Sequence, residues 1–453
     1  MSDPQVGSGP AGRWFERLVS TDAVAAVDDL PEAARAAVPA NAGRQVGATT
    51  LQKVGDLIVD AKTVLSWLLA ALGAPAGLTG LLVPIREAGS MLPQAALVAV
   101  VRRRAVRKWV WVSGAVLQAA AVLLMAVIAA TLDGAVAGTA ILVALALFAL
   151  ARSLSSIASK DVLGRTLPKG VRGQITGYAT IGAGVASITV GLGLRLLGDQ
   201  EPAPGTFAWL LAGASVAWLL AAALFARVEE QPDETAAHDR MDGSQDGENR
   251  GRNAGATRAA LALLRDDAPF RRFVLARTLL LVSALSPPFV VTLATEEAGA
   301  GLQGLGAFVI SSGVAAMIGG PVWGRLADRS SRRVMMLAAG LSAAVVLGFL
   351  AALALGLREV TLLYPATYLL LALVHHGSRI GRKTYVVDLA EGDRRTEYVA
   401  VSNTAIGVLL LVTGALTSAI ALLGPEAALA TLAGLGAAGV LVSGSLPEVS
   451  GQR

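Results

Sequence analysis

Long apolar segments recur along most of this 453-residue chain, and short charged turns separate them. A helix needs about 20 apolar residues to cross a bilayer, where every backbone polar group must be paired. Twelve such segments fit between residues 51 and 446. A composition of 54% hydrophobic and 16% charged residues excludes an ordinary soluble protein. The sequence therefore predicts an all-α membrane protein with twelve transmembrane helices.

Two groups of six spans flank one polar stretch. The expected spans are about 52–74, 76–101, 109–131, 138–158, 175–197 and 207–226, then 270–294, 304–323, 334–356, 361–380, 398–423 and 425–446. The predicted regions are an N-terminal tail (1–50), an N-terminal six-helix bundle (51–226), a flexible linker (227–268), a C-terminal six-helix bundle (269–446) and a tail (447–453). The linker is inferred because acidic residues among Gly, Asn and Arg cannot bury enough apolar surface to order a segment.

Lysine and arginine are concentrated in alternate loops. The basic clusters are Arg102–Lys108, Lys160–Arg172, Arg325–Arg333 and Arg379–Arg395, whereas the opposite loops hold mostly Asp and Glu. This bias predicts that both termini and the linker are cytoplasmic, in an inner or plasma membrane. Because topology explains the basic clusters, the net charge of +5 does not indicate a nucleic-acid partner. The lipid bilayer is the expected partner.

One charged turn carries a recognisable pattern. Gly324-Arg-Leu-Ala-Asp-Arg-Ser-Ser-Arg-Arg333 lies between two apolar segments and resembles the loop signature of the major facilitator superfamily. The residues that match are Gly324, Asp328, Arg329, Arg332 and Arg333; Ser331 stands where the family usually has a second glycine. The resemblance implies that this turn is a cytoplasmic gate motif, in which Asp328 helps to hold the gate shut. The corresponding turn of the first half, Arg102–Lys108, keeps only the positive charge.

An internal repeat supports two related halves. Gly170-Val-Arg172 and Gly392-Asp-Arg394 each precede an apolar helix rich in small residues. Two six-span halves joined by a long linker resemble the major facilitator fold over residues 51 to 446. The resemblance implies alternating access, with substrate bound near the bilayer midplane between the halves.

Four charged residues fall within the first two spans. Asp60, Lys62, Arg86 and Glu87 lie near the expected midplane, where an ionisable residue is costly and indicates function. They could form a structural network, pairing Asp60 with Arg86 or Lys62 with Glu87. Alternatively, they line a substrate and proton pathway with Glu87 as the coupling carboxylate. Adjacent residues on a helix point in different directions, so only one of Arg86 and Glu87 is expected to face the cavity.

Span ten contains His375 and His376, which are possible proton carriers because histidine titrates near neutral pH. Their position toward the basic loop favours packed or water-facing side chains. Arg152 and Arg277 are expected to snorkel toward lipid phosphate.

The chain has no cysteine, no nucleotide-binding glycine loop and no metal-ligand or nucleophile–base spacing. We therefore expect no enzyme activity, no cofactor and no metal. The leading interpretation is a secondary active transporter of a small organic solute or ion, coupled to protons and most simply monomeric. The alternative is a transporter-like receptor or assembly scaffold without transport.

The charge bias generates a test of topology. Reporter fusions after Arg104 and Glu230 should report cytoplasm, whereas fusions near Glu201 or Glu296 should report the opposite side. A cytoplasmic signal at Glu296 would overturn the twelve-span arrangement.

Overall fold

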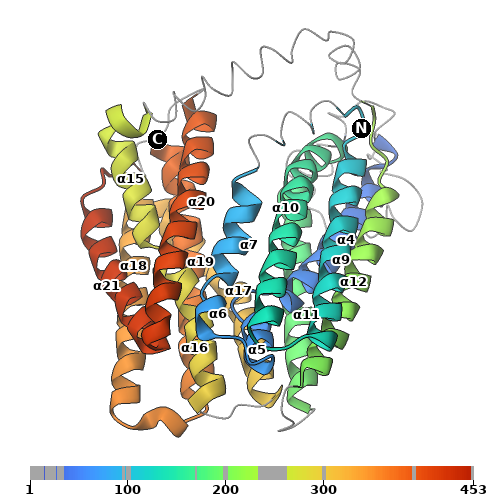
Figure 1. Ribbon diagram of the computed structural model, residues 1–453. Coiled ribbons are helices and arrows are strands. Elements are labelled where there is room, and N and C mark those ends of the chain that lie inside the picture. The colour runs from blue at the N-terminus through green and yellow to red at the C-terminus, as the bar shows by residue number, and fades with distance from the viewer. Residues whose placement is uncertain are drawn as a thin grey trace.

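The computed structural model describes residues 15, 27, 35–93, 97, 101, 104–168, 171–196, 203–232, 263–297, 302–389 and 394–449. The described residues contain helices and turns and no strand (Figure 1). Most of the expected N-terminal tail, the linker from 233 to 262 and residues 450–453 lie outside the described part of the chain.

The N-terminal half consists of helices that form successive spans, two of which are broken into a pair of helices. They are α4 (Val38–Ile58), α5 (Val64–Ala71), α6 (Ala76–Thr79), α7 (Leu82–Met91), α9 (Lys108–Thr131), α10 (Gly134–Thr166), α11 (Val171–Leu196) and α12 (Pro204–Ala226). The C-terminal half consists of α15 (Ala268–Leu279), α16 (Val282–Glu297), α17 (Leu302–Arg329), α18 (Ser331–Ala354), α19 (Leu363–Leu389), α20 (Arg394–Ile420) and α21 (Pro425–Gly444), with short 3₁₀ turns at Leu357–Glu359 and Ala421–Leu423.

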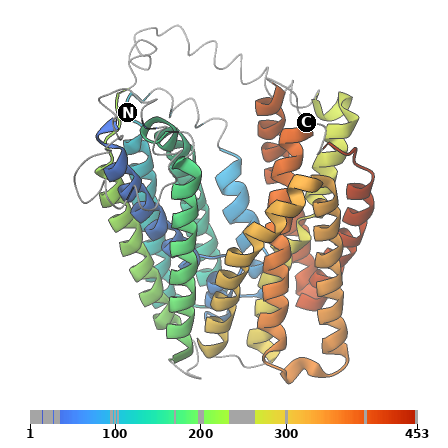
Figure 2. The same cartoon turned by 180° about the vertical axis from the view of Figure 1, so that it is seen from behind.

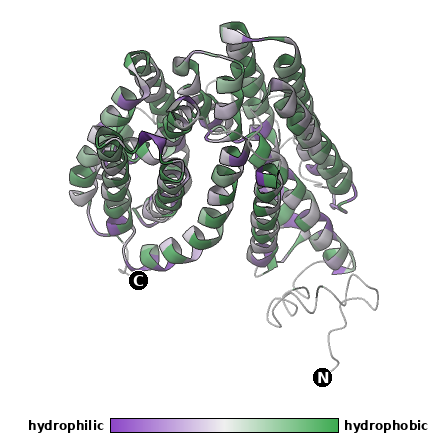
Figure 3. Ribbon diagram, turned by 90° about the horizontal axis from the view of Figure 1, so that it is seen from below, coloured by the Kyte–Doolittle hydropathy of each residue, from purple (hydrophilic) through white to green (hydrophobic). Residues whose placement is uncertain are grey.

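Nine of the candidate spans in the described residues are long and apolar enough to cross a membrane. The broken pairs α4–α5 and α6–α7 and the charged helix α19 occupy the three remaining expected positions. Large apolar side chains such as Leu117, Val143 and Leu219 are exposed on outer faces, and hydrophobic residues cover most helices (Figure 3). This distribution suits a multi-pass membrane protein, because lipid replaces water around the helices.

The helices form two bundles, one from each half of the chain, as both side views show (Figures 1 and 2). In the first bundle α9 packs against α10 and α12, and in the second α18 packs against α19 and α21. The end of α12 and the beginning of α15 lie at the same end of the molecule, here called the linker end.

The first span differs from its predicted form. α4 begins at Val38, inside the segment expected as a tail, and it packs against α11 and α12. Asn41 donates to the carbonyl oxygen of Glu229 at 2.9 Å, and Gln45 donates to the Thr166 hydroxyl at 2.8 Å. The span is also not continuous, since the helix stops at Ile58 and restarts at Val64.

The most extensive contact between the bundles is that of α11 with α17, and α7 also contacts α20. A Cβ on Gly191 would lie 2.9 Å from the Gly306 carbonyl oxygen, and Ser187 donates to the Val309 carbonyl oxygen at 3.0 Å. These residues lie toward the end opposite the linker end. Toward the linker end, Gly177 of α11 and Gly320 and Gly324 of α17 have open space around them. The two helices therefore converge at one end only (Figure 2).

This contact predicts a position-specific effect of side-chain size. Gly191→Val places a β-branched side chain against the backbone of α17, so the two helices must move apart. Overpacking of this kind lowers the free energy of unfolding by about 1–3 kcal/mol. Gly193→Val is the matched control, because Gly193 has nothing within 4 Å of an added Cβ. We expect a lower melting temperature for the Gly191 variant alone. Equal melting temperatures for the two variants would show that this contact is not tight.

Candidate functional site

A cavity of about 420 Å³ lies between the two bundles. Its lining comes from both halves and is dominated by charged and hydroxyl side chains: Asp56, Asp60, Ala61, Lys62, Val83, Arg86, Glu87, Ser90, Arg152, Ser283, Pro287, Ser312, Ala316, Tyr368, Ala372, His375, His376 and Arg379. The volume suits a small molecule, and the lining suits a polar one.

The break in the first span places Asp60 at the centre of this lining. Asp60 Oδ1 accepts from the backbone N–H of Lys62 at 2.9 Å and from the hydroxyl of Thr63 at 3.2 Å. The carbonyl oxygen of Asp60 accepts from the Leu65 N–H at 3.0 Å. Asp60 thus satisfies backbone groups that the interruption frees, as membrane helices require where they line a cavity.

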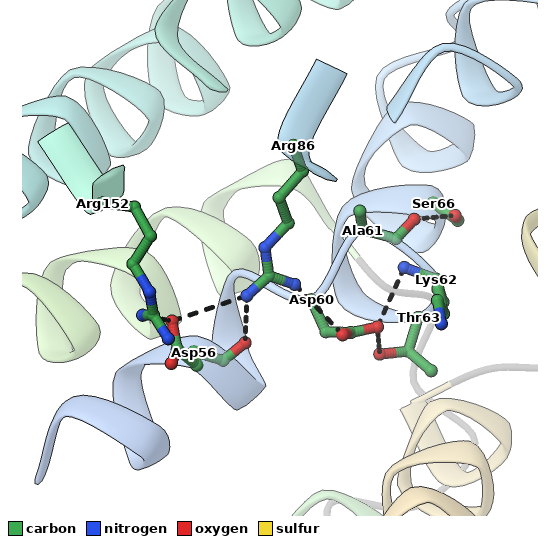
Figure 4. A network of polar contacts seen from close by, with 8 residues as sticks. All are labelled: Asp56, Asp60, Ala61, Lys62, Thr63, Ser66, Arg86 and Arg152. Carbon is green, nitrogen blue, oxygen red and sulfur yellow. Dashed lines mark hydrogen bonds and ion pairs between the residues drawn. The ribbon is translucent and has the colours of Figure 1, made fainter. Parts of the chain in front are cut away.

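Arg86 connects the broken helix to α7. Its guanidinium lies 3.2 Å from Asp60 Oδ2 and 3.5 Å from Asp56 Oδ1, and it donates to the Asp56 carbonyl oxygen at 3.4 Å (Figure 4). Arg152 of α10 forms a second ion pair with Asp56. The side chains of Asp56 and Arg86 are 16% and 17% exposed, so this network is largely screened from solvent. The expected pair of Asp60 with Arg86 is therefore present, within a larger network.

Lys62 and Glu87 behave differently from that network. Both line the cavity, but neither side chain makes a hydrogen bond or ion pair with another residue in the described ranges. The expectation that only one of Arg86 and Glu87 faces the cavity is wrong, because both line it.

The C-terminal bundle contributes α19 to the opposite wall. His375 and His376 both line the central cavity, a position compatible with the water-facing side chains expected for them. His375 Nδ1 lies 3.2 Å from the Ser283 hydroxyl of α16. Arg379, one turn further along α19, is exposed and has no ion pair among the described residues.

Neither arginine expected to snorkel does so. Arg152 points to Asp56 in the cavity wall. Arg277 of α15 is only 5% exposed and donates to the Ser402 hydroxyl and to Asn403 Oδ1, each at 2.9 Å. Hydrogen-bonding partners inside the protein replace the lipid phosphate in both cases.

The residues of the predicted gate motif lie at the linker end, away from the cavity. Helix α17 ends at Arg329, and Ser330 caps α18 by accepting from the Arg333 N–H at 3.1 Å. Arg332 contacts Glu448 at 3.3 Å and donates to the Leu446 carbonyl oxygen, so this turn binds the end of the second bundle. Gly324 has open space around it, and Asp328 is exposed on α17.

Sequence reasoning assigned no role to Asp56 or Tyr368 and placed Arg152 at the lipid surface, but all three line the cavity. Asp56 was visible as an acidic residue in an expected span, and that signal alone could have included it. Tyr368 carried no such signal. Among the described residues there is no group of three or more His, Asp or Glu that could hold a metal ion.

Comparison with known proteins agrees with the architecture. Residues 274–450 match the family model of the Major Facilitator Superfamily. No curated protein sequence matches the chain. Among solved structures, a D-xylose–proton symporter is similar with a TM-score of 0.66 and 12% identity, covering 90% of this chain and 99% of its own.

Two further structures extend the comparison. A POT family transporter in complex with a thioalcohol-conjugated peptide has a TM-score of 0.66 at 11% identity, covering 92% of this chain and 97% of its own. A nucleoside transporter has a TM-score of 0.67 at 12% identity, covering 90% and 99%. At these identities the likeness shows the fold. The family match covers the C-terminal bundle, and the solved structures extend the similarity in fold to both bundles.

Proposed function

We propose that this protein is a secondary active transporter that carries a small polar solute through the central cavity by alternating access. The observation that carries the proposal is the cavity itself, because both bundles line it and its wall is charged. A receptor or scaffold would not need uncompensated charge at this depth, where each such group is costly.

The contacts between the bundles support a rocking motion. The close packing of α11 on α17 is confined to the end opposite the linker end, and the helices diverge toward the linker end. With the linker and both termini in the cytoplasm, this arrangement is an inward-facing state. Small residues at the closed end allow the backbones to meet and to separate without interlocked side chains.

We further propose that Glu87 couples transport to protons. The cavity has three carboxylates, of which Asp56 and Asp60 are ion-paired with arginine and Glu87 is not, within the described residues. Removing the charge of Asp60 would break an ion pair with Arg86, and removing that of Asp56 would break ion pairs with both Arg86 and Arg152. Glu87 can instead take up a proton without breaking an ion pair, and it faces the solute space. His375 and His376 are the remaining candidates for a proton path.

The test compares Glu87→Gln with the wild-type protein in proteoliposomes. A thermal-shift screen of metabolites first supplies a solute, because a ligand that binds the folded state raises its melting temperature. A proton gradient should drive accumulation of that solute by wild type and not by Glu87→Gln. Solute exchange without a gradient should persist in the variant, because the amide keeps the shape of the side chain.

Two further variants make the result specific. Glu87→Asp should retain some gradient-driven accumulation, since it keeps a titratable carboxyl group. Glu359→Gln is the matched control, because Glu359 is an exposed residue in the turn between α18 and α19, outside the cavity. If Glu87→Gln is folded and accumulates solute at the wild-type rate, the proton carrier is a different residue.

A further inference from the structure

We infer that the solute is a small organic anion, bound between Lys62 of the first bundle and Arg379 of the second. This inference rests on the proposed transport function, to which it adds the chemical class of the substrate. Both side chains line the cavity, one from the break between α4 and α5 and the other from α19.

The charges that line the cavity do not balance. Four cationic side chains, Lys62, Arg86, Arg152 and Arg379, face three carboxylates, Asp56, Asp60 and Glu87. The cavity thus has a surplus of one positive charge when Glu87 is ionised, and of two when Glu87 carries a proton. An anion is the ligand that removes this surplus.

The ion pairs show which charges are available to a ligand. Asp56 and Asp60 are held by Arg86 and Arg152, so that these four side chains largely satisfy one another. Glu87 remains on the acidic side, and the two cations Lys62 and Arg379 remain without an ion pair among the described residues. They belong to different bundles, so an anion that contacts both joins the two halves across the cavity.

The surroundings of Arg379 add positive charge. Arg382 lies one turn further along α19, and its Nε is buried with no hydrogen-bond partner among the described residues. The positive charge of Arg382, which is partly buried, adds to the attraction of Arg379 for an anion. Hydroxyl groups of Ser283, Ser312 and Tyr368 also line the cavity and can donate to carboxylate or phosphate oxygens.

The arrangement links the anion to the proton. An ionised Glu87 repels an anion in the same cavity, and a proton on Glu87 removes that repulsion. The anion and the proton should therefore bind cooperatively, each raising the affinity of the protein for the other. Anion affinity should increase as the pH is lowered, and Glu87→Gln should reduce this dependence; any dependence left in the variant belongs to His375 and His376, which line the same cavity.

The experiment measures ligand binding by purified full-length protein with thermal shift and calorimetry. The library pairs organic acids and phosphate esters with neutral and cationic analogues: succinate beside succinamide and putrescine, glycerol phosphate beside glycerol, and further sets built in the same way. At least one acid or phosphate ester should raise the melting temperature, while its neutral and cationic analogues do not. The carboxylate and phosphate sets show which anionic group the site prefers.

Variants locate the bound anion. Lys62→Met and Arg379→Gln should each weaken binding of the stabilising anion by about tenfold or more, the effect of about 1.4 kcal/mol. Arg379→Lys should retain part of the affinity. Arg272→Gln is the matched control, since Arg272 is an exposed arginine of α15 outside the cavity, and its affinity should equal that of wild type.

Three results would overturn the inference: stabilisation by neutral or cationic compounds alone, anion binding that neither Lys62→Met nor Arg379→Gln weakens, or a library in which no anion binds. Failure of the transport proposal looks different. Anion binding at this site without gradient-driven uptake would leave the anion site in place and refute coupled transport. Gradient-driven uptake of a neutral or cationic solute would instead support coupled transport and refute the anion site.

Discussion

The ion-pair network around Asp60 is the interaction on which the rest of the site depends. The first span is interrupted in the membrane, and the freed backbone groups need partners that lipid cannot provide. Asp60 supplies them through its side chain and is held in turn by Arg86. Asp56 binds Arg86 and Arg152, which ties the same break to α7 and α10. Removing one partner of such a network leaves a buried charge uncompensated and costs about 3–5 kcal/mol.

The same network separates the charged side chains of the cavity into two groups, those that pair with one another and those that are available to a ligand. Its members neutralise one another within the first bundle. Lys62, in the break between α4 and α5, and Glu87, in α7, line the same cavity but remain outside the network. The second bundle adds Arg379 and the two histidines from a single helix, α19. The affinity for a solute that contacts both walls therefore depends on the relative position of the bundles, as alternating access requires.

Periodicity and charge predicted much of this molecule. The all-helical membrane fold is confirmed, because runs of about 20 apolar residues have few alternatives in lipid. The Asp60–Arg86 pair followed from two opposite charges at similar depth. The early start of α4 at Val38 could not be predicted in the same way, because this stretch is polar and is buried by contacts such as Gln45 with Thr166.

The remaining errors share a physical origin. The roles of Arg152 and Arg277 depend on partners in distant parts of the sequence, 96 and 125 residues away. The break at residues 59–63 contains no proline or glycine that would have predicted it, and the sequence does not show which face of α19 meets the cavity. Tertiary contacts decided each of these features.

The most direct test of the account measures two distances between the bundles in the same protein. Because the chain has no native cysteine, spin labels at introduced cysteines are unambiguous. One pair joins Gln174 of α11 to Arg325 of α17 at the linker end, and the other joins Leu196 to Gln303 at the opposite end. Lowering the pH or adding a transported solute should lengthen one distance while the other shortens. If both distances stay constant under every condition, the bundles do not rock about the cavity and the account is wrong.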